Sequence, residues 1–123
     1  MLTHLKHMLQ LLSLPGDDLL RHYPNGSCKS CEMALDYENW AGVVLGQDEA
    51  ELTREQRLKV IELNTHFSSF SGQRNAALWT DDAVRHAPEW TKVRRLTAEA
   101  LEHFGWDPVP PPTEWIAKFI AGH

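Results

Sequence analysis

The sequence has few cysteines, no long hydrophobic run and fewer basic than acidic residues. Its two cysteines, Cys28 and Cys31, are too few for the disulfide framework of a small secreted protein. No uninterrupted apolar segment approaches the roughly 20 residues that span a bilayer. The first residues also lack the basic segment, apolar run and cleavage site of a secretion signal. We therefore expect an intracellular, cytoplasmic protein that uses no membrane partner.

Basic residues are also too few for a protein that binds nucleic acid by neutralising phosphates. The chain has 12 Lys and Arg against 17 Asp and Glu, for a net charge of −5 with histidine neutral. The acidic excess is concentrated in residues 32–62. This stretch is either a solvated helix face with an acidic loop or a docking surface for a basic protein partner.

The remaining composition is that of a folded globular chain. Hydrophobic residues make up 42% of the 123 residues, and five of the residues are tryptophan. This length fits a single helical domain over residues 1–123 that buries roughly two thirds of its unfolded surface. Several of the tryptophans must lie in the core or at an interface because each is so large.

Hydrophobic periodicity predicts helices in the first half of the chain. Leucines at 2, 5, 9 and 12 form one helical stripe, which Pro15 and Gly16 end. A second helix is expected from about Ser27 to Trp40, ending near Gly42. The apolar residues 43–45 are either a short strand or the last buried turn of that helix.

Capping signals locate the later helices. Thr53 and Gln56 match a capping box, which predicts a helix to about Phe70. Thr80 followed by two acids predicts another helix start, and Pro88 begins a helix that Gly105 ends. The prolines between 108 and 112 predict an extended strap before a final helix capped by Thr113. The expected fold is an all-α compact bundle of five to six helices with this proline-rich strap before a short C-terminal helix.

The segment Cys28-Lys-Ser-Cys31 is the one motif with chemical potential, and it allows three interpretations. A zinc site needs four ligands, and His22 is the nearest candidate to join the pair. A redox dithiol is favoured at a helix N-terminus, with Lys29 nearby, although the βαβ context of a thioredoxin-like fold is absent. The third interpretation, which the sequence favours, is two reduced thiols packed on the inner face of a helix. We expect no cofactor.

The sequence contains no catalytic signature. Nucleophile-elbow, P-loop, dinucleotide-binding and metalloprotease motifs do not occur, and the seven histidines are scattered. No catalytic residue is assigned, and a non-enzymatic protein is expected.

The leading hypothesis for function is a non-catalytic protein-binding module, namely a small acidic inhibitor of the bacterial immunity-protein type that neutralises a basic toxin or nuclease-like enzyme. Alternatives are a phage-type inhibitor of a bacterial defence complex, a metal- or thiol-dependent protein using Cys28 and Cys31, and a homodimeric structural or regulatory subunit. The expected docking residues are the acids of the charged stretch with aromatic anchors: Glu32, Asp36, Tyr37, Glu38, Trp40, Asp48, Glu49, Glu51, Glu55 and Trp79.

Overall fold

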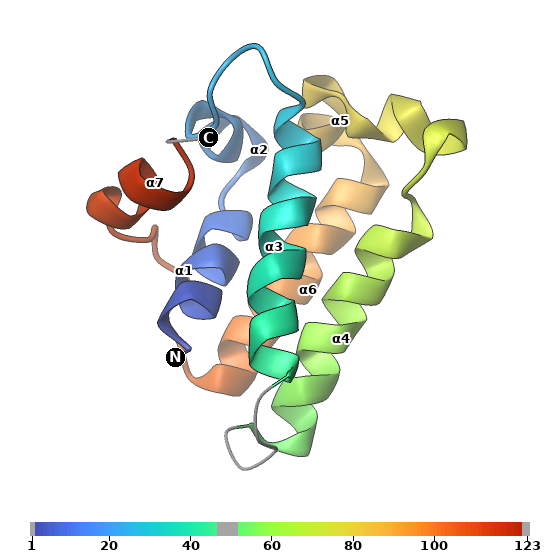
Figure 1. Cartoon of the computed structure of the whole chain (residues 1–123). Helices are drawn as coiled ribbons and strands as arrows, with labels where there is room; N and C mark the ends of the chain where they lie inside the picture. The colour runs from blue at the N-terminus through green and yellow to red at the C-terminus, as the bar shows by residue number, and fades with distance from the viewer. Residues whose placement is uncertain (1, 47–51, 122–123) are drawn as a thin grey trace.

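The computed structural model describes residues 2–46 and 52–121, and over these ranges the chain is helical and contains no strand (Figure 1). The helices are α1 (Thr3–Leu12), α2 (Gly16–Arg21), α3 (Lys29–Leu45), α4 (Arg54–Ser69), the 3-10 helix η2 (Gln73–Trp79), α5 (Asp81–His86), α6 (Pro88–Phe104) and α7 (Thr113–Phe119). The predicted all-α compact fold is confirmed. Over the described residues, the structure divides it into more helices than the five to six expected.

Four helices enclose the main core. α1 packs on α3 and α6, and α4 completes the ring by packing on both α3 and α6. The side chains inside this ring are fully buried, among them Leu9, Tyr37, Leu63 and Trp90. α2 and α5 pack against each other at one end of the ring, where η2 also contacts α5. The ring therefore positions the N-terminus of α3 close to η2.

Three helix boundaries follow the sequence signals. The Thr53 hydroxyl accepts a hydrogen bond from the Gln56 amide, and the Gln56 side chain accepts one from the Thr53 amide, which completes the capping box. α6 has Pro88 in its first turn, and Gly105 follows its last residue in the left-handed conformation. These three predictions are confirmed. The sequence shows these boundaries because each depends on neighbours within a few residues.

One alternative left open by the sequence is decided at the end of α3, and two other features differ from the sequence expectation. α3 continues through Gly42 to Leu45, so residues 43–45 are its last turn rather than a strand. The 3-10 helix η2 covers a polar segment for which no helix was predicted. Thr113 is the first residue of α7 and makes no capping hydrogen bond, because Pro112 occupies the cap position. The predicted Thr113 cap is therefore wrong.

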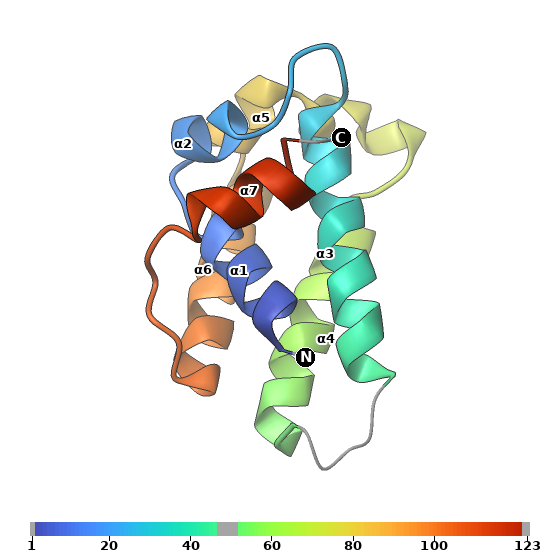
Figure 2. The same ribbon diagram turned by 60° about the vertical axis from the view of Figure 1, so that its left-hand side comes forward.

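The proline-rich strap crosses the outside of the ring and delivers α7 to α1 (Figure 2). The buried Gln10 side chain donates a hydrogen bond from Nε2 to the Asp107 carbonyl at 3.1 Å. The Trp115 indole donates from Nε1 to Nδ1 of His4 at 3.0 Å. Both hydrogen bonds start or end on α1, so they fix the strap and α7 to the N-terminal helix. Of the helices described, none is long and apolar enough to cross a membrane.

Candidate functional site

The N-terminus of α3 carries a disulfide between Cys28 and Cys31. Cys28 is the N-cap of the helix, and its Sγ accepts a hydrogen bond from the Cys31 amide at 3.3 Å. A spacing of three residues across the first helical turn brings the two Cα atoms to 5.2 Å, which suits a disulfide. Cys28 is exposed and Cys31 half-buried. The expectation of two reduced thiols packed on the inner helix face is therefore wrong, because the sulfurs are bonded and lie at the surface end of the helix.

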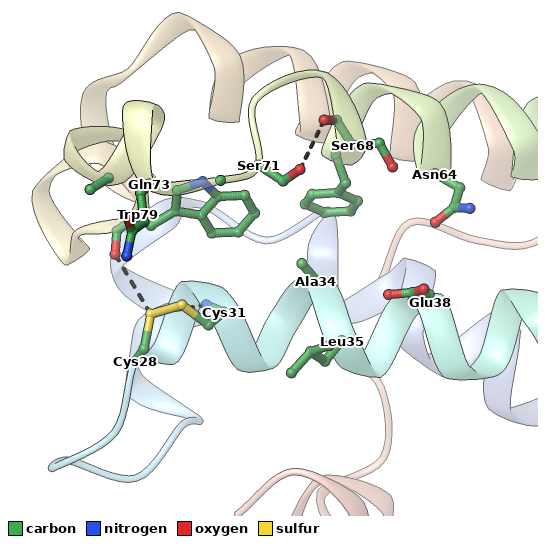
Figure 3. A pocket seen from close by; sticks show the side chains of 13 residues that line it. Cys28, Cys31, Ala34, Leu35, Glu38, Asn64, Ser68, Ser71, Gln73 and Trp79 are labelled. Carbon is green, nitrogen blue, oxygen red and sulfur yellow. Dashed lines mark hydrogen bonds between the residues drawn. A yellow bond between two sulfur atoms is a disulfide. The ribbon is translucent and has the colours of Figure 1, made fainter.

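The disulfide lies at one end of an open groove of about 610 Å³ (Figure 3). One wall of the groove is α3, which contributes Cys28, Cys31, Ala34, Leu35 and Glu38. Leu35 is 53% exposed although it is a large hydrophobic side chain. The groove therefore presents apolar surface directly next to the sulfurs.

The end of α4 and the 3-10 helix η2 form the opposite wall. Its side chains include Asn64, Phe67, Ser68, Gln73, Ala76 and Trp79. Gly72 joins the two helices with a φ of 96°, a conformation that residues with a Cβ rarely adopt. This turn directs η2 across the start of α3 and closes the groove at the disulfide end.

Indole hydrogen bonds hold η2 in place. Trp79 donates from Nε1 to the Phe70 carbonyl at 2.8 Å and stacks on the Phe70 ring, with 4.9 Å between centroids. The buried Trp90 donates from Nε1 to the Leu78 carbonyl at 2.7 Å. Both bonds attach η2 to the aromatic core, so the wall opposite the disulfide is anchored rather than loose.

The immediate surroundings of the Cys28 sulfur are polar. The Ser30 hydroxyl oxygen lies 3.5 Å from Sγ and donates to the Trp79 carbonyl at 2.8 Å. The Trp79 carbonyl oxygen is also 3.8 Å from the Cys28 Sγ. Because a sulfur in a disulfide carries no hydrogen, this contact is not a hydrogen bond in the oxidised protein. Lys29, expected to assist the sulfurs, instead donates from Nζ to the Leu20 carbonyl at 3.1 Å. Stabilisation of a Cys28 thiolate after reduction therefore comes from the Cys31 amide and the positive end of the α3 dipole.

Two of the predicted docking residues are in the core. Asp36 is 8% exposed and accepts a hydrogen bond at Oδ2 from the Tyr23 hydroxyl at 3.0 Å. Tyr37 is fully buried and donates to the Val60 carbonyl at 2.8 Å. Burial raises the pKa of both the Tyr23 and the Tyr37 hydroxyl above its usual range, so both keep their protons. Neither Asp36 nor Tyr37 is at the surface to meet a partner.

The other predicted docking residues lie in different places. Trp40 is half-buried on the side of α3 that faces α1, where it stacks on His4 with 4.2 Å between centroids. Glu32 is half-buried in the first turn of α3, and Glu55 is exposed in the first turn of α4. Asp48, Glu49 and Glu51 lie outside the described residues.

Of the described docking candidates, the structure brings two together, Glu38 and Trp79, on opposite walls of the groove. The weak metal candidate His22 is the C-cap of α2 and does not line the groove. Within residues 2–46 and 52–121, no three His, Cys, Asp or Glu side chains are grouped to hold a metal ion. In the oxidised state the two sulfurs are bonded to each other and are not available as thiolate ligands.

Sequence reasoning missed the groove itself. The sequence predicted that Cys28 and Cys31 pack on the inner face of a helix, whereas they line the groove together with Leu35. The glycine at position 72, directly after a predicted helix end, was the available signal that the chain turns sharply there.

Comparison with protein-family models, curated proteins and solved structures finds no match to this chain. Function is therefore argued from the geometry of the site alone.

Proposed function

We propose that this protein is a thiol–disulfide redox protein that exchanges its Cys28–Cys31 disulfide with the thiols of other proteins. The observation that carries the proposal is an exposed disulfide at the N-terminus of a 17-residue helix, opening onto an apolar groove. Helix N-termini stabilise thiolates, and a groove beside the sulfurs can hold the substrate while exchange takes place.

The reaction transfers two electrons from a substrate with two thiols. A substrate thiolate attacks Sγ of Cys28, the more exposed of the two cysteines, and the Cys31 sulfur leaves as a thiolate and takes up a proton. The second substrate thiolate then attacks the substrate sulfur of this mixed disulfide. Cys28 leaves as a thiolate and is protonated in turn. The substrate ends as a disulfide and the protein as a dithiol, which the reverse exchange with another protein disulfide reoxidises.

The Cys28–Cys31 disulfide is expected to stabilise the fold only weakly. Its two cysteines are three residues apart within one helical turn. Because a disulfide stabilises the fold less when the loop it closes is shorter, such a bond contributes roughly 2 kcal/mol. Many core residues are contributed by helices that the bond does not join. The small closed loop favours a chemical role over a structural one.

The predicted cytoplasmic location is kept as part of the proposal. In reducing compartments the disulfides that occur are mostly transient, catalytic or redox-sensing rather than structural. The hypotheses of an acidic inhibitor, of a phage-type inhibitor and of a homodimeric subunit stay predictions. We place exchange first because the described residues expected to dock a basic partner divide between the core, the first turns of α3 and α4, the α1 side of α3 and the groove.

Mixed-disulfide trapping tests the assignment. The reduced full-length Cys31→Ser and Cys28→Ser variants are each mixed with an unfolded test protein that retains one disulfide. The Cys31→Ser variant should accumulate roughly tenfold more mixed disulfide by mass spectrometry under non-reducing conditions, because Cys28 is exposed and no second thiol resolves the adduct.

The matched control is the Cys28→Ser/Cys31→Ser chain carrying Val43→Cys, which places one exposed thiol on the same helix far from its N-terminus. This control should form adducts no faster than a free cysteine peptide. Equal trapping by the Cys31→Ser variant and this control would overturn the proposed role of the α3 N-terminus.

A further inference from the structure

The apolar and charged side chains that line the groove indicate which thiols it accepts. Resting on the proposed exchange reaction, we propose that the substrate is an extended polypeptide segment whose cysteine is followed or preceded by apolar residues and, three positions away, by Lys or Arg. The inference depends on the apolar walls, on the charge at one end of the groove, and on the spacing between that charge and the disulfide.

The walls next to the disulfide favour apolar side chains. Leu35 lines one side of the groove, and Phe67, Ala76 and Trp79 line the other. Covering the half-exposed Leu35 removes apolar surface from water, which favours binding at about 25 cal/mol per Å². A substrate that places apolar residues beside its cysteine gains this energy, whereas a small hydrophilic thiol does not.

Among the described side chains that line the groove, Glu38 is the one that carries a charge. Its carboxylate is exposed and makes no hydrogen bond or ion pair within the described part of the chain. Lys29, the nearest base in sequence to the disulfide, is held at the Leu20 carbonyl. An anionic thiol such as glutathione therefore finds no cation in the groove, while a cationic side chain finds Glu38 free to pair. The net charge of −5 favours the same partners at longer range.

The spacing along α3 fixes where the cation belongs. Figure 3 shows Cys31, Leu35 and Glu38 following one another along the groove wall. The attacked Cys28 sulfur is bonded directly to the Cys31 sulfur, and Glu38 is seven residues after Cys31, which corresponds to about 10 Å along the helix at 1.5 Å per residue. An extended peptide advances about 3.3 Å per residue, so a residue about three positions from the cysteine reaches Glu38.

Blocked tetrapeptides with one thiol test this inference on the oxidised full-length protein. The set is Cys-Val-Leu-Lys and Lys-Leu-Val-Cys, which cover both chain directions, their counterparts with Glu in place of Lys, and Cys-Lys-Val-Leu with the base moved next to the cysteine. The second-order rate constant of mixed-disulfide formation is followed by acid quench and mass spectrometry. Glu38→Gln and Glu38→Lys variants are compared with Glu114→Gln, which neutralises an exposed acid on α7.

One of the two Lys peptides should react about fivefold faster than its Glu counterpart and faster than Cys-Lys-Val-Leu, as expected for an exposed ion pair in water. High salt and Glu38→Gln should bring the ratio to about one, Glu38→Lys should invert it, and Glu114→Gln should leave it unchanged. If all peptides react within twofold of one another, or if the preference survives Glu38→Gln, the inference is overturned and exchange at Cys28 stands. If no peptide reacts faster with the folded protein than with the chain unfolded in urea, the proposed function itself fails.

Discussion

Cys28 is the N-cap of α3 and caps the helix with its sulfur atom. Ser, Thr, Asp or Asn usually occupies this position. The same atom accepts the Cys31 amide hydrogen bond and forms the disulfide with Cys31. After reduction a Cys28 thiolate still accepts that amide hydrogen bond and gains the favourable field of the helix N-terminus. We therefore expect residue 28 to cap the helix in both redox states, so the proposed exchange does not require α3 to unfold.

His4 makes stability depend on pH just below neutrality. Burial, and then the charges of His7 and Lys118, lower the pKa of the imidazole below its ordinary value of 6.5. The Trp115 indole also donates to Nδ1, which requires that nitrogen to be unprotonated. Unfolded His4 thus binds a proton at a higher pH than folded His4 does. The free energy of unfolding should be highest above pH 6.5 and should fall as the pH drops through 6.5 toward the lowered folded value.

Urea unfolding at pH 7.5 and at pH 5.0 measures this loss. His4→Phe keeps an aromatic ring at the position that stacks on Trp40 but does not titrate, so its loss between the two pH values should be smaller than that of the unmodified chain. The exposed His86→Gln serves as the control and should lose as much as the unmodified chain. An identical loss for His4→Phe would contradict the role of His4.

Among the helices, the sequence predicted the ends that local signals encode. It did not predict the helix η2, which distant contacts hold in place. The capping box at Thr53 and the glycine end of α6 act within one turn, so the sequence shows them. η2 is held by indole hydrogen bonds that join Trp79 to Phe70 and Trp90 to Leu78, and no local pattern in residues 73–79 reveals them.

The contact between α2 and α5 gives a prediction at this scale. A Cβ added at Gly16 would lie 2.9 Å from the Arg85 Cα and 3.1 Å from the Val84 carbonyl oxygen, both backbone atoms of α5. Gly16→Ala should therefore push the two helices apart and lower the free energy of unfolding by about 1–3 kcal/mol in urea titrations.

Gly42→Ala is the matched control, because it lies inside α3 with no atom within 4 Å of the added Cβ. It should raise the free energy of unfolding by about 0.5–1 kcal/mol through the lower entropy of the unfolded chain. If Gly16→Ala behaves like Gly42→Ala, the close approach of α2 and α5 is not rigid.

For the whole molecule, composition and periodicity were sufficient to predict an all-α compact fold. They could not predict the site, because the exposure of Leu35 depends on how far η2 stands from α3. The disulfide between the two cysteines could not be predicted from the sequence either. Their spacing allows a zinc ligand pair, a dithiol or a disulfide. The structure has the disulfide, at the exposed end of the helix.

The main core is built from side chains on α1, α3, α4 and α6, so the fold should survive reduction. Treatment with a phosphine reductant should leave the helical circular dichroism unchanged and lower the free energy of unfolding by about 2 kcal/mol or less. The Cys28→Ser/Cys31→Ser chain should show the same stability as the reduced protein. A reduced chain that unfolds at 25 °C would assign the disulfide a structural role instead.

The central claim is that the Cys28–Cys31 disulfide is passed to other proteins, and the rate of that transfer tests it most directly. The oxidised full-length protein and glutathione disulfide are compared at equal concentration as oxidants of a reduced, unfolded test protein that carries two cysteines flanked by apolar and basic residues. We expect the protein to form the disulfide in the test protein at least roughly tenfold faster, since the proposed groove would hold the substrate beside Cys28. Transfer no faster than that from glutathione disulfide would contradict it.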